Sequence, residues 1–223
     1  MTLADNFTPS TFVDAFRFMG THFSLLLTKA GELSELAFAS LGVALLLALP
    51  LGLWLGHKHR GLFLALSVST FGRALPSIAL IGFFIALLGV GFWNNLIALV
   101  VLGIPPILAN AYFAVDGVER DVVEAARGIG LTERQILLRV ELPLGLPLIL
   151  AGIRISAVFV IATATIASVA GGEGLGDIIV NQASYGLAGV LAAALWVSAI
   201  ALLTAFVLAL SQHAVSRRMS PKT

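Results

Sequence analysis

Long stretches without a charged residue recur along the sequence. They lie at 36–57, 61–72, 74–115, 142–153, 155–172 and 178–216. A helix needs about 20 residues to cross roughly 30 Å of hydrocarbon, and several of these stretches exceed that length. The composition agrees, because 59% of the residues are hydrophobic, whereas soluble domains are usually about 45–50% apolar. The sequence therefore predicts an integral membrane protein.

The apolar stretches are continuous runs and lack the alternation of polar and apolar residues that is typical of membrane β-strands. A helix satisfies its own backbone polar groups in lipid, so the predicted fold class is all-α.

The sequence has no cysteine, which excludes disulfides and thiolate metal sites. It also contains no phosphate-binding G-x-x-x-x-G-K-[ST] motif and no hydrolase or metalloprotease motif. We expect a protein that is not an enzyme and that has no metal site or cofactor of its own.

About five transmembrane helices are expected, and the loop 91–95 (GFWNN) is interpreted as a turn at the membrane surface. The Pro105-Pro106 pair is expected to bend the third crossing. The five crossings are placed at 36–56, 61–91, 96–115, 145–170 and 188–213.

The second crossing contains a helix break between Arg73 and Pro76, because proline lacks an amide hydrogen and disfavours a helical residue before it. Irregular backbone at membrane depth must be covered by protein or water. This favours a position on an internal translocation path, with Ser77, Thr163 and Thr165 as polar neighbours. The alternative is a kinked helix packed on its neighbours, with the Arg73 side chain extended to the membrane surface.

The distribution of lysine and arginine predicts the orientation, since cytoplasmic loops carry an excess of both residues. With the polar insert 116–143 on the cytoplasmic side, that side holds nine of the thirteen positive residues: Lys58, Arg60, Arg120, Arg127, Arg134, Arg139, Arg217, Arg218 and Lys222. The opposite side holds Arg17 and Lys29. The tetrad His57-Lys58-His59-Arg60 is interpreted as an anchor at the lipid headgroups.

The chain divides by composition into three segments. Residues 1–33 form an extracytoplasmic or interfacial segment, 34–213 a transmembrane domain and 214–223 a cytoplasmic tail. Within the first segment, residues 11–30 combine apolar and charged side chains and favour an interfacial helix over a sixth crossing.

The polar insert is predicted to contain two short helices. Residues 121–127 (DVVEAAR) favour a helix, and Gly128 and Gly130 permit a sharp turn after it. Thr132 and Gln135 match the capping-box pattern, with Leu131 and Ile136 at the positions of a hydrophobic staple, and Pro143 is expected to end the second helix. The apolar side of this element must contact either the protein's own surface or a separate partner.

The insert resembles the EAA loop of the permease subunits of ABC importers. The residues that match are Glu124, Ala125, Ala126, Gly130, Val140, Leu142 and Pro143, with valine at position 140 where isoleucine is usual. The resemblance implies that this loop, including Leu131, is a cytoplasmic coupling helix that docks on a separate ATPase subunit.

Further segments resemble the permeases of osmoprotectant importers for glycine betaine, choline or carnitine. They include RALPSIALIGFF, IPPILANAYFAVDGV and GLGDIIV, and the resemblance extends over about residues 34–212. It implies a multi-pass protein of a prokaryotic inner or plasma membrane. The partners implied are two copies of an ABC ATPase that binds ATP and Mg, a second permease subunit as dimer partner, an extracytoplasmic substrate-binding protein and membrane lipid, but no nucleic acid.

Two other functions remain open from the sequence. The same machinery is compatible with methionine or another small polar solute as cargo. A stand-alone channel or secondary carrier is disfavoured because Arg73 and Arg154 have no acidic partner within a span. Glu173 lies in a loop where such permeases usually carry a run of four glycines, and it is interpreted as an exposed loop charge in preference to a gating or docking residue.

Overall fold

A computed structural model describes residues 9–219, and all regular structure in that range is helical, as the sequence predicts. The elements are α1 (Pro9–Thr21), α2 (Phe23–His57), α3 (Leu62–Ala74), α4 (Ser77–Leu88), α5 (Phe92–Asp116), α6 (Arg120–Gly128), α7 (Glu133–Ile136), the π-helical turn η2 (Leu137–Glu141), α8 (Leu142–Ala164), the 3-10 helix η3 (Thr165–Ala170), α9 (Leu175–Val180) and α10 (Gln182–Met219).

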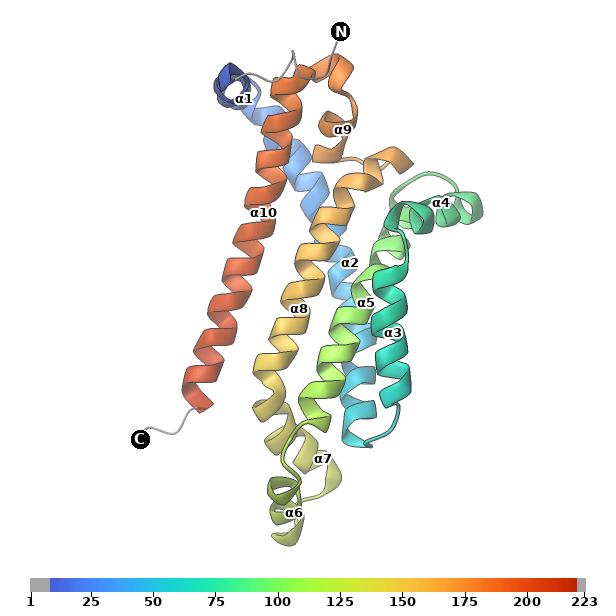
Figure 1. The fold of residues 1–223 in the computed structure, drawn as a ribbon, viewed down its shortest axis with the longest axis vertical. Coiled ribbons are helices and arrows are strands. Elements are labelled where there is room, and N and C mark those ends of the chain that lie inside the picture. The colour runs from blue at the N-terminus through green and yellow to red at the C-terminus, as the bar shows by residue number, and fades with distance from the viewer. Residues whose placement is uncertain (1–8, 220–223) are drawn as a thin grey trace.

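Four helices in the described range are long and apolar enough to cross a membrane, at 23–57, 92–116, 133–168 and 182–217. The second predicted crossing, 61–91, is instead divided into two helices. The first of them, α3, runs beside α5, whereas α4 turns across the end of the bundle (Figure 1). The chain leaves the helical conformation at Leu75 and Pro76, so the predicted break is confirmed.

The central helix of the bundle is α5, which packs against α2 on one side and α8 on the other. Glycines permit both contacts. A Cβ atom added to Gly52 of α2 would lie 2.7 Å from the carbonyl oxygen of Leu108, and one added to Gly152 of α8 would lie 2.9 Å from that of Pro106. In membranes, helices associate mainly through such close backbone packing, because burial of apolar surface provides little driving force there.

We expect Gly52→Val to destabilise the bundle, since the new side chain would push α2 away from α5. Overpacking of this kind typically costs about 1–3 kcal/mol. Gly42→Val is the matched control on the same helix, because nothing lies within 4 Å of a Cβ atom at that position. Thermal unfolding of the detergent-solubilised protein measures the difference. Equal melting temperatures for the two variants would contradict this packing.

Several boundaries differ from those predicted. The first crossing begins at Phe23 and not at residue 36, so the proposed interfacial helix 11–30 is wrong as a single element. Its first half is α1, which packs on α10, and its second half belongs to α2. The division at 33/34 consequently falls inside α2. Residues 1–8 and 220–223, the outermost parts of the two terminal segments, lie outside the described residues.

The predicted turn at 91–95 is also shifted. Residues 89–91 form the turn, and Phe92 already begins α5. Asn94 and Asn95 are fully buried in the first turn of that helix, where helix formation and packing override their preference for loops. Pro105 and Pro106 lie inside α5, which continues through both residues.

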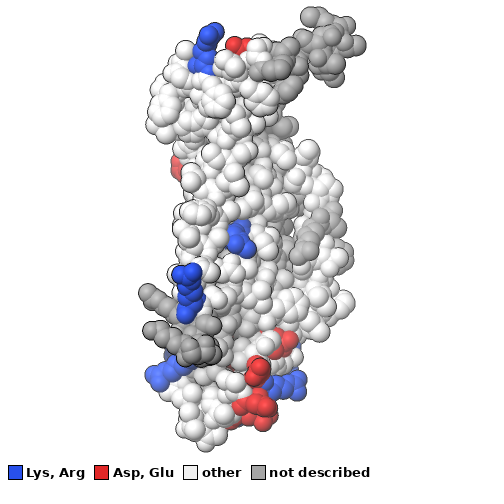
Figure 2. All heavy atoms as spheres, turned by 60° about the vertical axis from the view of Figure 1, so that its left-hand side comes forward, with Lys and Arg blue, Asp and Glu red and all other residues white. Residues whose placement is uncertain are grey.

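Most charged side chains lie toward the two ends of the molecule, and the face shown in Figure 2 carries only scattered charged side chains between them, including a blue one near mid-height. One end carries α6 and α7, the turn between α2 and α3 and the C-terminal end of α10 (Figure 1). The opposite end carries α1 and α9. The three segments predicted to share the cytoplasmic side therefore lie at the same end of the bundle.

Candidate functional site: the polar insert

The insert protrudes from one end of the bundle as α6 and α7 (Figure 1). Val123 and Ala126 of α6 are buried against Ile136 of α7. Val118, Leu131 and Val140 complete this small apolar cluster. The apolar side of the second short helix thus contacts α6 and is not free to dock on another protein.

The end of α6 is a left-handed turn centred on Gly130, whose φ is +88°. The amide of Gly130 donates to the carbonyl of Arg127 at 3.0 Å, and the amide of Leu131 donates to that of Ala126 at 3.2 Å. These two bonds form a Schellman motif, which favours glycine at the left-handed position. Gly128 is the last residue of α6 and has no positive φ, so only one of the two predicted turn glycines is required by the backbone.

The predicted capping box is confirmed at the start of α7. The backbone amide of Gln135 donates to the hydroxyl oxygen of Thr132 at 3.4 Å, and the backbone amide of Thr132 donates to Oε1 of the Gln135 side chain at 2.8 Å. These bonds satisfy amides that the first helical turn leaves without intrahelical partners.

We expect Thr132→Ala to lower the stability of the first turn of α7 by about 1 kcal/mol, whereas Thr132→Ser should preserve the cap. The measurement is hydrogen exchange at the amides of 133–136, where alanine should raise local opening about fivefold. Unchanged exchange in the alanine variant would show that the cap contributes nothing.

An ion pair lies within the insert, and contacts of His57 link the insert to α2. Arg127 donates from Nε to Oε1 of Glu133 at 3.0 Å and from a second nitrogen to Oε2 at 3.3 Å. Nε2 of His57, at the end of α2, lies 3.3 Å from Oε2 of the same glutamate. Nδ1 of His57 lies 2.6 Å from Oε2 of Glu141. His57 therefore joins the end of α2 to α7 and to the turn that precedes α8.

Glu141 is buried, with 1% of its surface exposed, and the His57 side chain is only 7% exposed. The interpretation of His57 as a headgroup anchor is consequently wrong. His59 is paired with Asp116 at 2.8 Å but is 43% exposed, and Lys58 and Arg60 are exposed. The sequence gives no direct signal for the contact of His57 with Glu141, because 84 residues separate them.

The prediction that Pro143 ends the second short helix is wrong. The chain continues through the π-helical turn Leu137–Glu141 into α8, and the amide of Leu142 donates to the carbonyl of Leu137. This wider turn explains why the helix continues: proline lacks an amide hydrogen and clashes with the carbonyl four residues earlier in an ordinary α-helix. The second short helix α7, the turn η2 and α8 thus form one continuous helical path.

The α6 side of the insert carries an exposed row of apolar side chains. Val122, Ala125 and Ile129 are exposed at helical spacing along that helix, and Ile129 is 81% exposed. Glu124 is exposed beside them, whereas Ala126 is buried, Leu131 and Val140 are half-buried in the cluster, and Leu142 and Pro143 are half-buried at the start of α8. An exposed apolar stripe rimmed by charged residues is typical of a protein interaction surface.

The predicted translocation-path residues lie at or beside two interruptions of α-helical structure, the break between α3 and α4 and the junction of α8 with η3. Pro76 is exposed at the N-terminus of α4, and Ser77 is half-buried. Thr163 is buried near the end of α8, and Thr165 begins η3, with its hydroxyl donating to the carbonyl of Ala162 at 2.6 Å. The α4 helix packs against η3, which places the two segments side by side. The side chain of Arg73 lies outside the described part of the structure.

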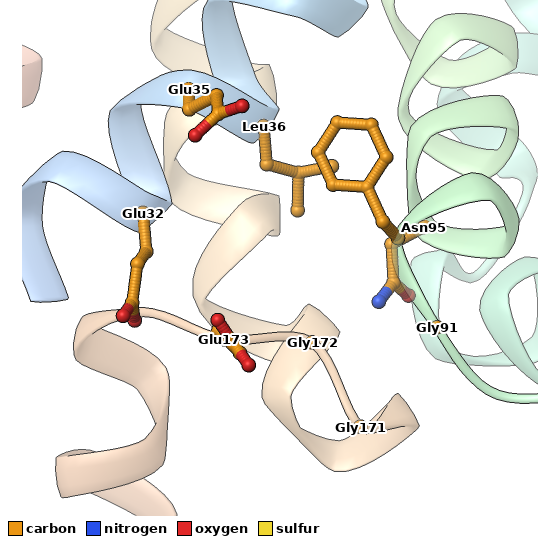
Figure 3. A pocket seen from close by; sticks show the side chains of 9 residues that line it. Glu32, Glu35, Leu36, Gly91, Asn95, Gly171, Gly172 and Glu173 are labelled. Carbon is orange, nitrogen blue, oxygen red and sulfur yellow. The ribbon is translucent and has the colours of Figure 1, made fainter.

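A pocket of about 310 Å³ opens between α2, the start of α5 and the 171–174 loop (Figure 3). Glu173 of the 171–174 loop lines it together with Glu32 and Glu35 of α2. Asn95 of α5 also lines the pocket, and its side-chain nitrogen Nδ2 donates to the carbonyl of Ala167 at 3.4 Å. Glu173 is exposed, as the sequence predicts for a loop charge, but it faces a cavity that the sequence does not reveal.

Residues 48–221 match the family described as "Binding-protein-dependent transport system inner membrane component". The chain belongs to this family. It is 35% identical over 206 residues to the glycine betaine/carnitine/choline transport system permease protein OpuCB of Bacillus subtilis, covering 92% of this chain and 93% of the relative. It is 37% identical over 189 residues to the carnitine transport permease protein OpuCB of Listeria monocytogenes, covering 84% of each.

Among solved structures, the chain is similar to an inward-facing conformation of the MetNI methionine ABC transporter. The TM-score is 0.74 at 22% sequence identity, over 87% of this chain and 98% of the other. This similarity shows the permease fold and carries no information about cargo. Membership of the family confirms the resemblance to ABC-importer permeases and the expectation of a membrane transport subunit that is not itself an enzyme. The predicted membrane location is supported by the same family and by the apolar helices.

Proposed function

We propose that this chain is the permease of an ATP-driven importer for a quaternary-ammonium osmoprotectant such as glycine betaine, choline or carnitine. The observation that carries the proposal is the structured insert on a member of a binding-protein-dependent transport family. The complex would contain a dimer of this permease, or of this and a similar permease, with two ATPase subunits that bind ATP and Mg. An extracytoplasmic binding protein would deliver the cargo to a chain in a prokaryotic inner or plasma membrane.

In this proposal α6 docks on the ATPase through Val122, Ala125 and Ile129, with Glu124 available to a basic partner. Ala126, Gly130, Leu131 and Val140 hold α6 at a fixed angle to α7. Leu142 and Pro143 lie where the insert becomes α8, so movement of α6 and α7 is passed directly into a membrane-spanning helix. ATP hydrolysis would thereby change the packing of α8 in the bundle.

The orientation that we propose places the insert, the α2–α3 turn and the end of α10 in the cytoplasm. The excess of lysine and arginine at that end supports it. Arg73, Pro76, Ser77, Thr163 and Thr165 would line the path between the two sides. Their placement on α3, α4, α8 and η3, at two neighbouring interruptions of helical structure, supports this part of the proposal.

The cargo class rests on the relatives' names and not on a cage of aromatic residues, the usual means of holding a quaternary ammonium. The second candidate cargo is methionine or another small polar solute. Uptake of labelled choline and glycine betaine by the reconstituted complex, in competition with unlabelled carnitine and with methionine, separates the two. Competition by carnitine alone supports an osmoprotectant importer, and competition by methionine alone contradicts it.

A further inference from the structure

A groove runs between α8 and α10 and has two different halves. The first half is a shallow, open hollow of about 770 Å³, lined by apolar α10 residues, among them Ala199, Leu202 and Phe206. The second half is also open, has a volume of about 290 Å³ and is lined by polar residues that include Gln212, His213 and Ser216. Arg154 of α8 lines both halves. Its guanidinium group therefore lies where the apolar half of the groove meets the polar half.

Arg154 has no partner for its charge within the described part of the chain, where it forms neither an ion pair nor a side-chain hydrogen bond. Neither α8 nor α10 contains an aspartate or a glutamate. An unpaired charge on a membrane-spanning helix is costly and is usually neutralised by a partner or extended to the membrane surface. An anion bound in this groove would neutralise it.

The groove is oriented like a phospholipid in the membrane leaflet on the same side as the insert, with its polar end toward the insert and its apolar end toward the middle of the bundle. Arg154 shares the polar half with Pro147, about two helical turns or 10 Å closer to the insert, so its side chain extends toward that end. The apolar half extends the other way along α10 from Ala209 to Ala199. These residues cover about 15 Å of helix, which is half of the roughly 30 Å hydrocarbon thickness.

We propose that this groove binds an anionic phospholipid, with its phosphate on Arg154 and one acyl chain along α10 from Ala209 toward Ala199. His213 and Ser216 lie at the headgroup end and offer further hydrogen-bond donors. Basic pockets between membrane-spanning helices on the cytoplasmic side suit anionic lipid headgroups in this way. Assigning the lipid to the cytoplasmic leaflet rests on the proposed orientation, whereas the site itself does not require the ATPase.

The test uses the full-length permease, purified without the ATPase in mild detergent and delipidated. Native mass spectrometry then measures the retention of added phosphatidylglycerol and phosphatidylcholine. We expect the wild type to retain phosphatidylglycerol preferentially and Arg154→Gln to lower that retention about fivefold. Arg154→Lys should retain part of it. Arg60→Gln is the matched control, because it removes an exposed positive charge at the same end of the bundle but away from the groove.

Ala205→Trp tests the acyl-chain half of the groove without changing a charge, since Ala205 lines that half. It should lower phosphatidylglycerol retention as well. Inorganic phosphate at the same concentration should not displace the lipid, because it offers the anion without the chain.

Three results would overturn the proposal: equal phosphatidylglycerol retention in Arg154→Gln and wild type, displacement of the lipid by inorganic phosphate, or loss of the permease dimer in Arg154→Gln. The last result would make the groove a contact between two copies of the chain. A permease that retains the lipid but does not couple to an ATPase would contradict the proposed function and leave the lipid site standing.

Discussion

Replacement of Gly130 by valine should reduce ATP-driven uptake about tenfold while leaving membrane insertion intact. Gly130 has a φ of +88°, and a left-handed conformation costs a residue with a side chain about 1–2 kcal/mol, with β-branched residues the least tolerant. The strain is torsional, since nothing lies within 4 Å of a Cβ atom at this position. We therefore expect the turn to change its backbone conformation and α6 to lose its fixed angle to α7.

The matched control is Gly128→Val, two residues earlier. That position also has nothing within 4 Å of an added Cβ atom, but it has ordinary helical backbone angles. It should retain most of the uptake. The measurements are substrate-stimulated ATP hydrolysis and uptake in liposomes that contain the reconstituted complex, together with co-purification of the ATPase. Equal activity of the two valine variants would show that the left-handed turn is not needed for coupling.

Replacement of His57 by alanine should produce the largest loss of stability. It leaves the Glu141 carboxylate buried without its histidine partner, and removal of one member of a buried pair typically costs about 3–5 kcal/mol. For a chain of this size the melting temperature should fall by roughly 10 °C. Because His57 also contacts Glu133, the insert should lose its connection to α2 and transport should fall with stability.

His59→Ala is the control for this prediction, because its pair with Asp116 is largely exposed and such pairs contribute about 0–1 kcal/mol. A double variant with leucine at both 57 and 141 should recover most of the stability, since it removes both polar partners together. Thermal unfolding in detergent separates the three variants. A melting temperature for His57→Ala no lower than that for His59→Ala would contradict the role of the buried pair.

The sequence predicts those features of the fold that depend on local physical chemistry. The capping box at Thr132, the turn at Gly130 and the helix break before Ser77 each follow from a few neighbouring residues, and each is found in the structure. The spans themselves follow from the length of the uncharged stretches. Such features depend little on how the helices pack.

The features that the sequence did not predict depend on contacts between distant segments. The buried pair of His57 and Glu141 joins residues far apart in the chain, and in the sequence His57 is one of several basic residues at a helix end. The sequence places the start of the first crossing too late, because it does not show that Lys29 is paired with both Glu32 and Asp177. These pairs permit charged residues on the extended helix α2. The continuation through Pro143 depends on a π-helical turn, which residue patterns do not reveal.

In the proposed importer, this permease transports only when its insert is coupled to an ATPase subunit. The most direct measurement is uptake of labelled choline into liposomes that contain the permease with its ATPase and binding protein, compared with liposomes that contain the permease alone. We expect uptake that requires the ATPase and ATP, and that falls about tenfold when Gly130→Val replaces the wild-type permease. Uptake at the same rate by the permease alone would instead indicate a channel or secondary carrier.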